Sequence, residues 1–498
     1  MVLPGLIDSH SHPTGASVTE LDHELPDFET IQNVLDYIEA RTKVVPPGQW
    51  IILRQVFITR LREQRYPTRA ELDRVAPRHP VLYGTGPDAS VNSLALQLAG
   101  IDKNFRMPPG EPGFPEKDPQ TGEPTGILRR CTHLLKARST AKSATEEDYL
   151  VRLPMLFRDY NSVGLTTIGD RDSSPATVAR YVKLHQQGTL SVRIAALLDF
   201  SSSGPLEDIE QAIRKAAEHP QYRDKNGPVR VIGVKTYLDG GMLTGSAYML
   251  QPWGVSKIYS ITDPAYRGVL FIPHERLLPM VRTAVECDLQ FSAHTVGDGA
   301  VQALLDVYEE VNKTRPIRDS RPCISHSNFM SPESVQRYAR LGVCPDMQPA
   351  WLYLDTRTLV QHFGYDRLRW FQPLRSLFEA GAIAGGGSDH MQKIGSLRSN
   401  NPYDPLLGIW TTITRRARWY EGQLHPEESL SREQAIRFYT WNNAYLLRME
   451  SQVGSLEPGK CADLIVLDRD LLTCPVDDIR AAQVLATYLD GRPVFERK

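Results

Sequence analysis

The stretch Val2-Leu3-Pro4-Gly5-Leu6-Ile7-Asp8-Ser9-His10-Ser11-His12 decides the fold of this chain. Its apolar part predicts a buried β-strand over Leu3–Asp8, with His10 and His12 at the carboxyl end. Side chains two apart on an extended chain point to the same side, so the two imidazoles converge on one point. Enzymes built on parallel α/β barrels carry their chemistry at such strand ends. The stretch therefore predicts half of a metal site, although alone it fits a polar turn equally well.

The composition is that of an ordinary soluble globular protein. The 498 residues are 41% hydrophobic and 23% charged, and the net charge of −2 argues against a nucleic-acid partner. No apolar run is long enough to cross a bilayer, so we expect no membrane partner. The start of the chain does not resemble a signal peptide, and the six cysteines form no C-x-x-C pair. We therefore expect free thiols and a cytoplasmic location.

From about residue 150 onward, short apolar strands alternate with amphipathic helices, which is typical of a parallel α/β fold. Apolar residues recur at helical spacing in Leu206–His219 and Gly299–Asn312. With the first strand, the predicted strands number eight, as in a (β/α)8 TIM barrel. The other seven are Gly164–Ile168, Val192–Leu198, Val229–Thr236, Leu289–Ala293, Cys323–Ser325, Val343–Pro345 and Ala382–Gly386.

Two regions interrupt the barrel pattern. The long stretch after strand 1 predicts a large insertion over residues 31–150 that forms a lid above the active site. Residues 1–30 then hold barrel strand 1 and the metal-binding loop, and residues 151–450 hold the rest of the barrel. At the other end, residues 451–498 predict a small C-terminal β unit, a partial β-sandwich, in which Val484–Leu489 and Asp490-Gly491 form a hairpin with Val494-Phe495.

Four more polar residues stand at the carboxyl ends of predicted strands, namely Lys235, His294, His326 and Asp389. Each has a plainer interpretation: a hydrogen-bonded structural histidine, a helix cap for Asp389, or an ion pair between Lys235 and Asp239. A buried, unpaired ammonium is costly, so Lys235 should be neutralised, paired or chemically modified. Together with the first two histidines the four lie at one end of the barrel. Imidazole and carboxylate are the ligands expected for zinc and similar divalent ions.

These residues make the chain resemble the amidohydrolase superfamily, and within it the YtcJ-like metal-dependent hydrolases of amidohydrolase family 3. The resemblance covers essentially the whole chain. The motifs that carry it are Pro4–His12, Val234-Lys235 with Asp239-Gly240-Gly241, His294–Asp298, Ser325-His326-Ser327, Gly387-Ser388-Asp389, Pro67–Asp73, Gly122–Leu128 and Gly454–Asp463.

The resemblance implies a binuclear metal centre, with zinc as the expected metal. By this likeness His10 and His12 bind the more buried ion, while His294 and His326 hold the second. Lys235 would be carboxylated and bridge the two ions. Asp389 would be both a ligand of the first ion and the proton acceptor as a metal-activated hydroxide attacks a carbonyl. The implied reaction is hydrolysis of an amide-type C–N bond of a small molecule.

Other parts of the chain depart from the family pattern. We expect substrate contacts from Asp88, Asn92, Asp239 and His390, although a structural role for His390 fits equally well. Relatives carry several strands before the first barrel strand, whereas here Met1 stands at the barrel strand itself. Either the start is misassigned or the chain has half a sandwich, and then Asp463–Leu467 has an unpaired edge. An unpaired edge of this kind, and the resemblance to a family whose members commonly form dimers, favour a homodimer.

Two alternative functions stay open at this point. The first is a deaminase or cyclic-amide hydrolase of the same superfamily, against which Lys235 counts because deaminases usually work with one metal. The second is a non-catalytic regulatory protein, against which the retention of all six ligand positions counts. The substrate itself cannot be identified from the sequence.

Overall fold

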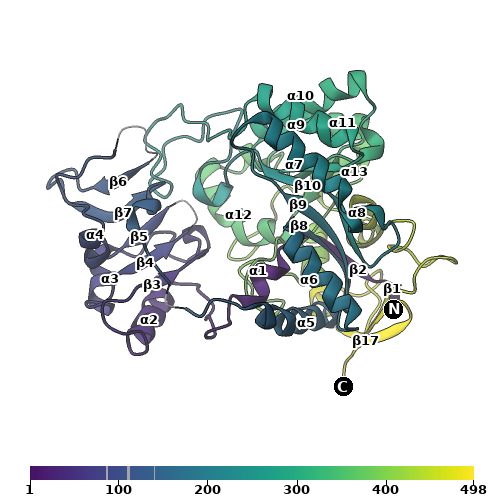
Figure 1. The fold of residues 1–498 in the computed structure, drawn as a ribbon, viewed down its shortest axis with the longest axis horizontal. Helices are drawn as coiled ribbons and strands as arrows, with labels where there is room; N and C mark the ends of the chain where they lie inside the picture. The colour runs from purple at the N-terminus through teal and green to yellow at the C-terminus, as the bar shows by residue number, and fades with distance from the viewer. Residues whose placement is uncertain (86–87, 109–112, 140) are drawn as a thin grey trace.

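The fold is described from a computed structural model that covers residues 1–498 except 86–87, 109–112 and 140. Its centre is a parallel barrel sheet in the order β14-β13-β12-β11-β10-β9-β8-β2. Figure 1 labels four of these strands, β2, β8, β9 and β10. The predicted eight-stranded (β/α)8 barrel is confirmed, although the last strand is much shorter than expected. The strands are β2 Leu6–Ser11, β8 Leu165–Ser173, β9 Arg193–Asp199, β10 Val229–Tyr237, β11 Gln290–Thr295, β12 Cys323–His326, β13 Cys344–Met347 and β14 Gly385–Gly386.

Helices surround the barrel, which is why its strands are buried on both faces and rich in apolar residues. The two helices predicted from periodicity are confirmed as α7 Leu206–Glu218 and α10 Asp298–Thr314. No helix of the described residues is long and apolar enough to cross a membrane. The other helices outside the insertion are α1 Pro13–Val18, α5 Glu146–Ser162, α6 Pro175–Gln186, α8 Pro220–Arg223, α9 His274–Glu286, α11 Pro332–Leu341, α12 Pro349–Phe363, α13 Leu374–Ala380, α14 Pro405–Thr414, α15 Arg432–Arg437 and α16 Asn443–Leu446.

The first and last barrel strands meet through residues that follow them. The Asp389 backbone N–H donates to the His10 carbonyl (2.8 Å), and the His12 N–H donates to the His390 carbonyl (2.8 Å). Gly387 permits this approach, because a Cβ at that position would collide with Asp8 and with the backbone of His10. The closure therefore lies at the carboxyl ends of the strands, where the predicted ligands stand.

The predicted first strand is in fact two strands that belong to different sheets. β1 (Val2–Pro4) pairs antiparallel with β15 (Leu464–Leu467), and the chain crosses to the barrel at Gly5. A side chain at Gly5 would collide with Thr166, so the crossing requires glycine. The expectation that Met1 stands at the barrel strand is therefore wrong. Sequence periodicity did not separate the two strands because both are short, apolar and nearly continuous.

The C-terminal sheet also corrects the expected unpaired edge. Its order is β1-β15-β16-β17, so β15 is paired on both sides. β16 (Val484–Leu489) and β17 (Arg492–Glu496) form the predicted hairpin. This pairing removes the structural reason for expecting a second subunit at β15, and the homodimer itself stays a prediction.

The predicted insertion contains a five-stranded sheet in the order β3-β4-β5-β7-β6, which stands beside the barrel next to α12 (Figure 1). Buried apolar residues from α2, β3 and β4, among them Val34, Leu53 and Tyr83, form a core of its own. Its elements are α2 Ile31–Thr42, β3 Ile51–Leu53, α3 Arg69–Val75, β4 Val81–Gly84, β5 Ala89–Val91, α4 Ser93–Leu98, β6 Phe114–Lys117 and β7 Pro124–Arg129.

A buried ion pair joins the C-terminal sheet to the barrel and gives a test of this arrangement. Asp463 accepts two hydrogen bonds from Arg193 at the start of β9, at 2.7 and 3.0 Å. Asp463→Asn should lower the free energy of unfolding by about 3 kcal/mol, because it leaves the buried Arg193 charge with only the exposed carboxylate of Asp490, 3.8 Å away, as a counter-ion. Urea denaturation followed by circular dichroism measures this loss.

The matched control is Glu379→Gln, which breaks an exposed pair with Arg375. Its cost should stay below about 1 kcal/mol. Equal losses for the two variants would contradict a stabilising role for the Arg193–Asp463 pair.

Candidate metal centre

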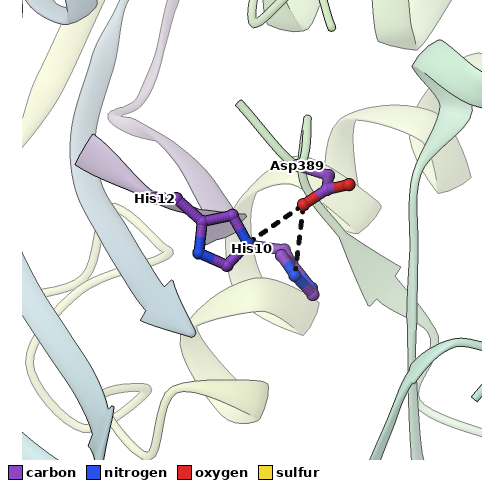
Figure 2. A group of neighbouring side chains, drawn as sticks. All are labelled: His10, His12 and Asp389. Atoms are coloured by element: carbon purple, nitrogen blue, oxygen red, sulfur yellow. Dashed lines mark hydrogen bonds and ion pairs between the residues drawn. The ribbon is translucent and has the colours of Figure 1, made fainter. Parts of the chain in front are cut away.

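Three side chains from the first and last strands converge at the barrel mouth. One carboxylate oxygen of Asp389, Oδ1, lies 3.1 Å from His12 Nε2 and 3.5 Å from His10 Nε2 (Figure 2). One potential ligand atom of each residue lies within 4.8 Å of the others. The closure of the barrel produces this convergence, because the backbones of His10 and Asp389 are hydrogen-bonded to each other. The group offers two imidazoles and a carboxylate, a donor set that fits a divalent metal.

The other two histidines extend this group. His294 in β11 and His326 at the end of β12 have ring centroids 4.5 Å apart, and the His326 ring is 4.7 Å from that of His10. Lys235, in β10, is the remaining member, with its Nζ 4.6 Å from the centre of the Tyr237 ring. The structure thus brings all six sequence-predicted ligands to one end of the barrel.

The His10 ring is fixed in the orientation that a metal ligand requires. Its Nδ1 lies 2.8 Å from Asp346 Oδ2, and this carboxylate accepts the ring proton. The opposite nitrogen, Nε2, is buried and makes no hydrogen bond among the described residues. A buried polar atom without a partner is costly, and a metal ion would satisfy it. The residues present therefore fit a metal at this position.

His326 is held in a similar way from a neighbouring strand. Its Nδ1 lies 2.8 Å from the Gln348 side-chain oxygen, so this nitrogen donates and Nε2 is left to act as an acceptor. The Trp351 ring stacks on the imidazole at 4.7 Å with an interplanar angle of 13°. The backbone of His326 itself is left-handed, with φ of 78°, a strained conformation that these contacts maintain.

Burial keeps most of the imidazoles neutral, which is their ligating form. It lowers the pKa of His10 and His326 well below the ordinary value and that of His294 to about 3, and the nearby charge of Lys235 adds to the effect. Burial also lowers the pKa of His12, but the hydrogen bond to Asp389 and the charge of that carboxylate together outweigh burial and leave this pKa raised.

Lys235 is almost entirely enclosed, with 1% of its surface exposed. Among the described residues no carboxylate lies within 4.0 Å of its Nζ, so the suggested ion pair with Asp239 is not formed. Burial lowers the pKa of Lys235. The mouth beside it carries the half-exposed Tyr237 ring, whose hydroxyl donates to Asp172 (3.1 Å).

Comparison with known proteins identifies the family. The model of the amidohydrolase family matches residues 1–495 of the 498. The chain belongs to the amidohydrolase family. This confirms the resemblance and makes the protein a hydrolase of C–N bonds.

Two relatives of this amidohydrolase illustrate the range of the family. The N-substituted formamide deformylase of Arthrobacter pascens is 28% identical over 510 residues, covering 100% of this chain and 88% of that protein. The exoenzymes regulatory protein AepA of Pectobacterium carotovorum is 27% identical over 73% of this chain and 77% of that protein. An uncharacterized metal-dependent hydrolase from Pyrococcus horikoshii has the same fold, with a TM-score of 0.65 at 22% identity over 96% of this chain and 87% of that chain.

The four residues expected to contact the substrate of this amidohydrolase instead form hydrogen bonds or ion pairs within the protein. Asp239 accepts the backbone N–H groups of three residues, Tyr248, Val296 and Gly297, each at 2.9 Å. The His390 ring is buried, between the Tyr160 hydroxyl and two backbone carbonyls. The structure therefore favours the structural role for His390.

The remaining two belong to the insertion. Asn92 caps α4 and bonds backbone groups with both ends of its amide. Asp88 pairs with Arg129 at 3.0 Å. All four side chains are thus occupied by intramolecular contacts, which leaves no support for their expected substrate contacts.

Several residues around the site were missed by the sequence interpretation. Asp346 follows the predicted strand Val343–Pro345 directly, so the strand-end rule that found His326 could have found it. Gln348 and Tyr237 also lie at strand ends, but neither residue type alone indicates a metal site. Asn401, which contacts Asp389, lies in a loop and has no such signal.

The role of Asp346 can be tested through metal affinity. Asp346→Asn removes the carboxylate that orients His10, and we expect zinc affinity to fall by about 10- to 100-fold, as for other residues that support a ligating histidine. Competition with a chromophoric chelator measures this affinity.

Asp404→Asn is the matched control, because it alters a carboxylate that caps α14 through one oxygen, a contact that asparagine can keep. Its zinc affinity should change by less than about threefold. Unchanged affinity in folded Asp346→Asn would contradict the assigned orientation of His10.

Proposed function

We propose that this amidohydrolase uses divalent metal ions to cleave an amide-type C–N bond of a small, uncharged or weakly polar molecule. The observation that carries the proposal is the convergence of His10, His12 and Asp389 at the barrel mouth, with the His10 Nε2 buried and without a hydrogen-bond partner among the described residues. The rings of His294 and His326 lie beside this group. A protein that only scaffolds has no need of this arrangement, because burying such groups unpaired costs stability.

The residues divide into two sets of ligands. His10, His12 and Asp389 would hold one ion, His294 and His326 the other, and carboxylated Lys235 would bridge them. Zinc is the metal we propose, since it favours nitrogen and oxygen donors of this kind. When bound, such ions supply hydroxide at neutral pH and polarise the carbonyl group of the amide.

Asp389 is the residue to which we assign proton transfer. Its carboxylate takes the proton of the attacking water and returns it to the nitrogen of the leaving amine. Its position is well defined, because its backbone is bonded to His10 and its Oδ1 faces both histidines. The resulting products are a carboxylic acid and an amine.

The proposed modification of Lys235 resolves the cost of its burial. The neutral amine attacks carbon dioxide, an N–C bond forms and one proton is released, which leaves an anionic carbamate. This group presents two oxygens, whereas the protonated lysine would be a buried charge with no carboxylate within 4.0 Å among the described residues. A deaminase working with one metal has no need of such a bridge, so Lys235 favours the amide hydrolase over the deaminase.

The six cysteines are free, which supports the proposed cytoplasmic location. For the substrate, the similarity to a formamide deformylase supports N-substituted formamides and N-acyl amines. Tyr237, with 40% of its surface exposed beside Lys235, offers an apolar wall at the mouth. Its neighbour Asp172 would repel a carboxylate on the substrate, so this lining favours an uncharged amide.

The metal content tests the proposed centre. Purified protein loaded with zinc and then desalted should hold about two ions per chain by plasma mass spectrometry. Lys235→Ala should lose at least one of them, whereas Lys225→Ala, which removes a lysine remote from the site, should keep both. Folded wild-type protein that retains no metal would contradict the proposed metal centre.

A substrate panel tests the reaction. We expect the zinc-loaded protein to release amine from N-formyl and N-acyl alkylamines, and the metal-stripped protein to release none until zinc is restored. A matched N-formyl amino acid, which differs by its carboxylate, should be hydrolysed at least about tenfold less efficiently, because Asp172 repels it. No release from any amide by the metal-loaded protein would contradict the hydrolase assignment and favour the regulatory alternative.

A further inference from the structure

We propose that Arg60 of the inserted unit and Asn401 are positioning residues that hold Asp389 in its ligating and proton-accepting geometry. The proposal rests on the proposed function, since it concerns the same aspartate. It gives the insertion, which stands beside the barrel, a role in shaping the metal centre. Three successive contacts carry it.

The first contact supports the strained backbone of Asp389. Its φ is 57°, in the left-handed region that non-glycine residues rarely adopt. The Asp389 N–H is bonded to His10, and the carbonyl accepts a hydrogen bond from Asn401 Nδ2 at 2.6 Å. The same Nδ2 lies 3.5 Å from the carboxylate Oδ2. Asn401 thus contacts both the backbone and the side chain of Asp389 on the side away from the histidines.

The second contact fixes the amide of Asn401. This side chain is 1% exposed, and its Oδ1 accepts a hydrogen bond from Arg60 Nη1 at 2.7 Å. Because arginine only donates, the amide oxygen must face Arg60 and the amide nitrogen must face Asp389. The Asp389 carbonyl, which only accepts, requires the same orientation, so Arg60 and Asp389 together fix the Asn401 amide from its two ends.

The third contact anchors Arg60 to the barrel. Arg60 ends the short 3-10 helix Ile58–Arg60 of the insertion and makes a two-pronged pair with Asp355 of α12, at 2.9 and 2.8 Å. Its Nη1 also donates to the Asn400 carbonyl at 2.7 Å. Since Asp355 is 1% exposed and neutralises the guanidinium, Arg60 is poorly placed to bind an anionic substrate. Its Nη1 is the atom that also donates to the Asn401 side chain.

The same interface also contains a contact that does not reach the centre. Gln64, four residues after Arg60, donates to Thr358 of α12 at 2.6 Å. Removing it weakens the attachment of the insertion to α12 and leaves the Asn401–Asp389 contact intact. Gln64→Ala therefore separates a loss of attachment from a loss of positioning.

The experiment compares Asn401→Ala, Arg60→Lys, their double variant and Gln64→Ala in the full-length protein. Two quantities are measured: zinc retention against a chelator, and kcat and KM on the best amide of the panel. We expect Asn401→Ala to lose zinc affinity by about 10-fold or more and kcat by a similar factor, with KM within about twofold. Arg60→Lys should show a smaller loss of zinc affinity and kcat. The single ammonium group of lysine cannot reproduce the arginine's simultaneous hydrogen bonds to Asp355 and Asn401.

The double variant tests whether the two residues act in series. Adding Arg60→Lys to Asn401→Ala should cause no further loss of zinc affinity, since Arg60 acts through the amide that is already gone. Gln64→Ala should match the wild type in zinc retention and kcat. If Asn401→Ala does not fold, Arg60→Lys against Gln64→Ala carries the comparison.

Three results would overturn the inference. One is an Asn401→Ala or Arg60→Lys protein that retains zinc and turns over like the wild type. Another is a Gln64→Ala protein that loses as much as Arg60→Lys, which would assign the effect to attachment alone. A wild-type protein that binds no metal overturns the proposed function together with this inference. The first two results, obtained with a wild type that does bind metal, overturn this inference alone.

Discussion

The closure of the barrel between its first and last strands is the constraint on which the site depends. Two backbone hydrogen bonds, from Asp389 to His10 and from His12 to His390, join segments that are far apart along the chain. They place the carboxylate of Asp389 against both imidazoles. A glycine at position 387 is required for this approach, because any side chain there would displace the backbone of His10. Fold and site are thus specified by the same contacts.

The electrostatics of the centre follow from its burial. Enclosure keeps His10 and His326 neutral, and the residues behind them, Asp346 and Gln348, fix which ring nitrogen carries the proton. Asp346 is itself neutralised by the buried Arg171, at 3.3 Å. The buried Nε2 of His10 has no hydrogen-bond partner among the described residues, and leaving it unsatisfied costs stability. A cation held by His10, His12 and Asp389 would satisfy this nitrogen, which is why we propose that the arrangement binds metal.

The sequence was sufficient for the barrel and for the placement of the six candidate ligands at one end of it, because both rest on local signals: apolar runs and the polar residue that ends each run. It was insufficient where a partner lies far along the chain. The pairing of β1 with β15 joins residues more than 450 positions apart, and three-residue strands carry no periodicity of their own. The same limit applies to Asn92 and His390, whose polar groups are occupied by residues that only the fold brings near.

Anomalous diffraction at the zinc edge, from crystals of the zinc-loaded protein, would locate the metal ions. We expect one peak about 2 Å from His10 Nε2 and His12, and a second beside His294 and His326. Electron density for a carboxyl group on Lys235 should lie between the two peaks. A single ion beside an unmodified Lys235, or peaks away from these side chains, would contradict the binuclear centre.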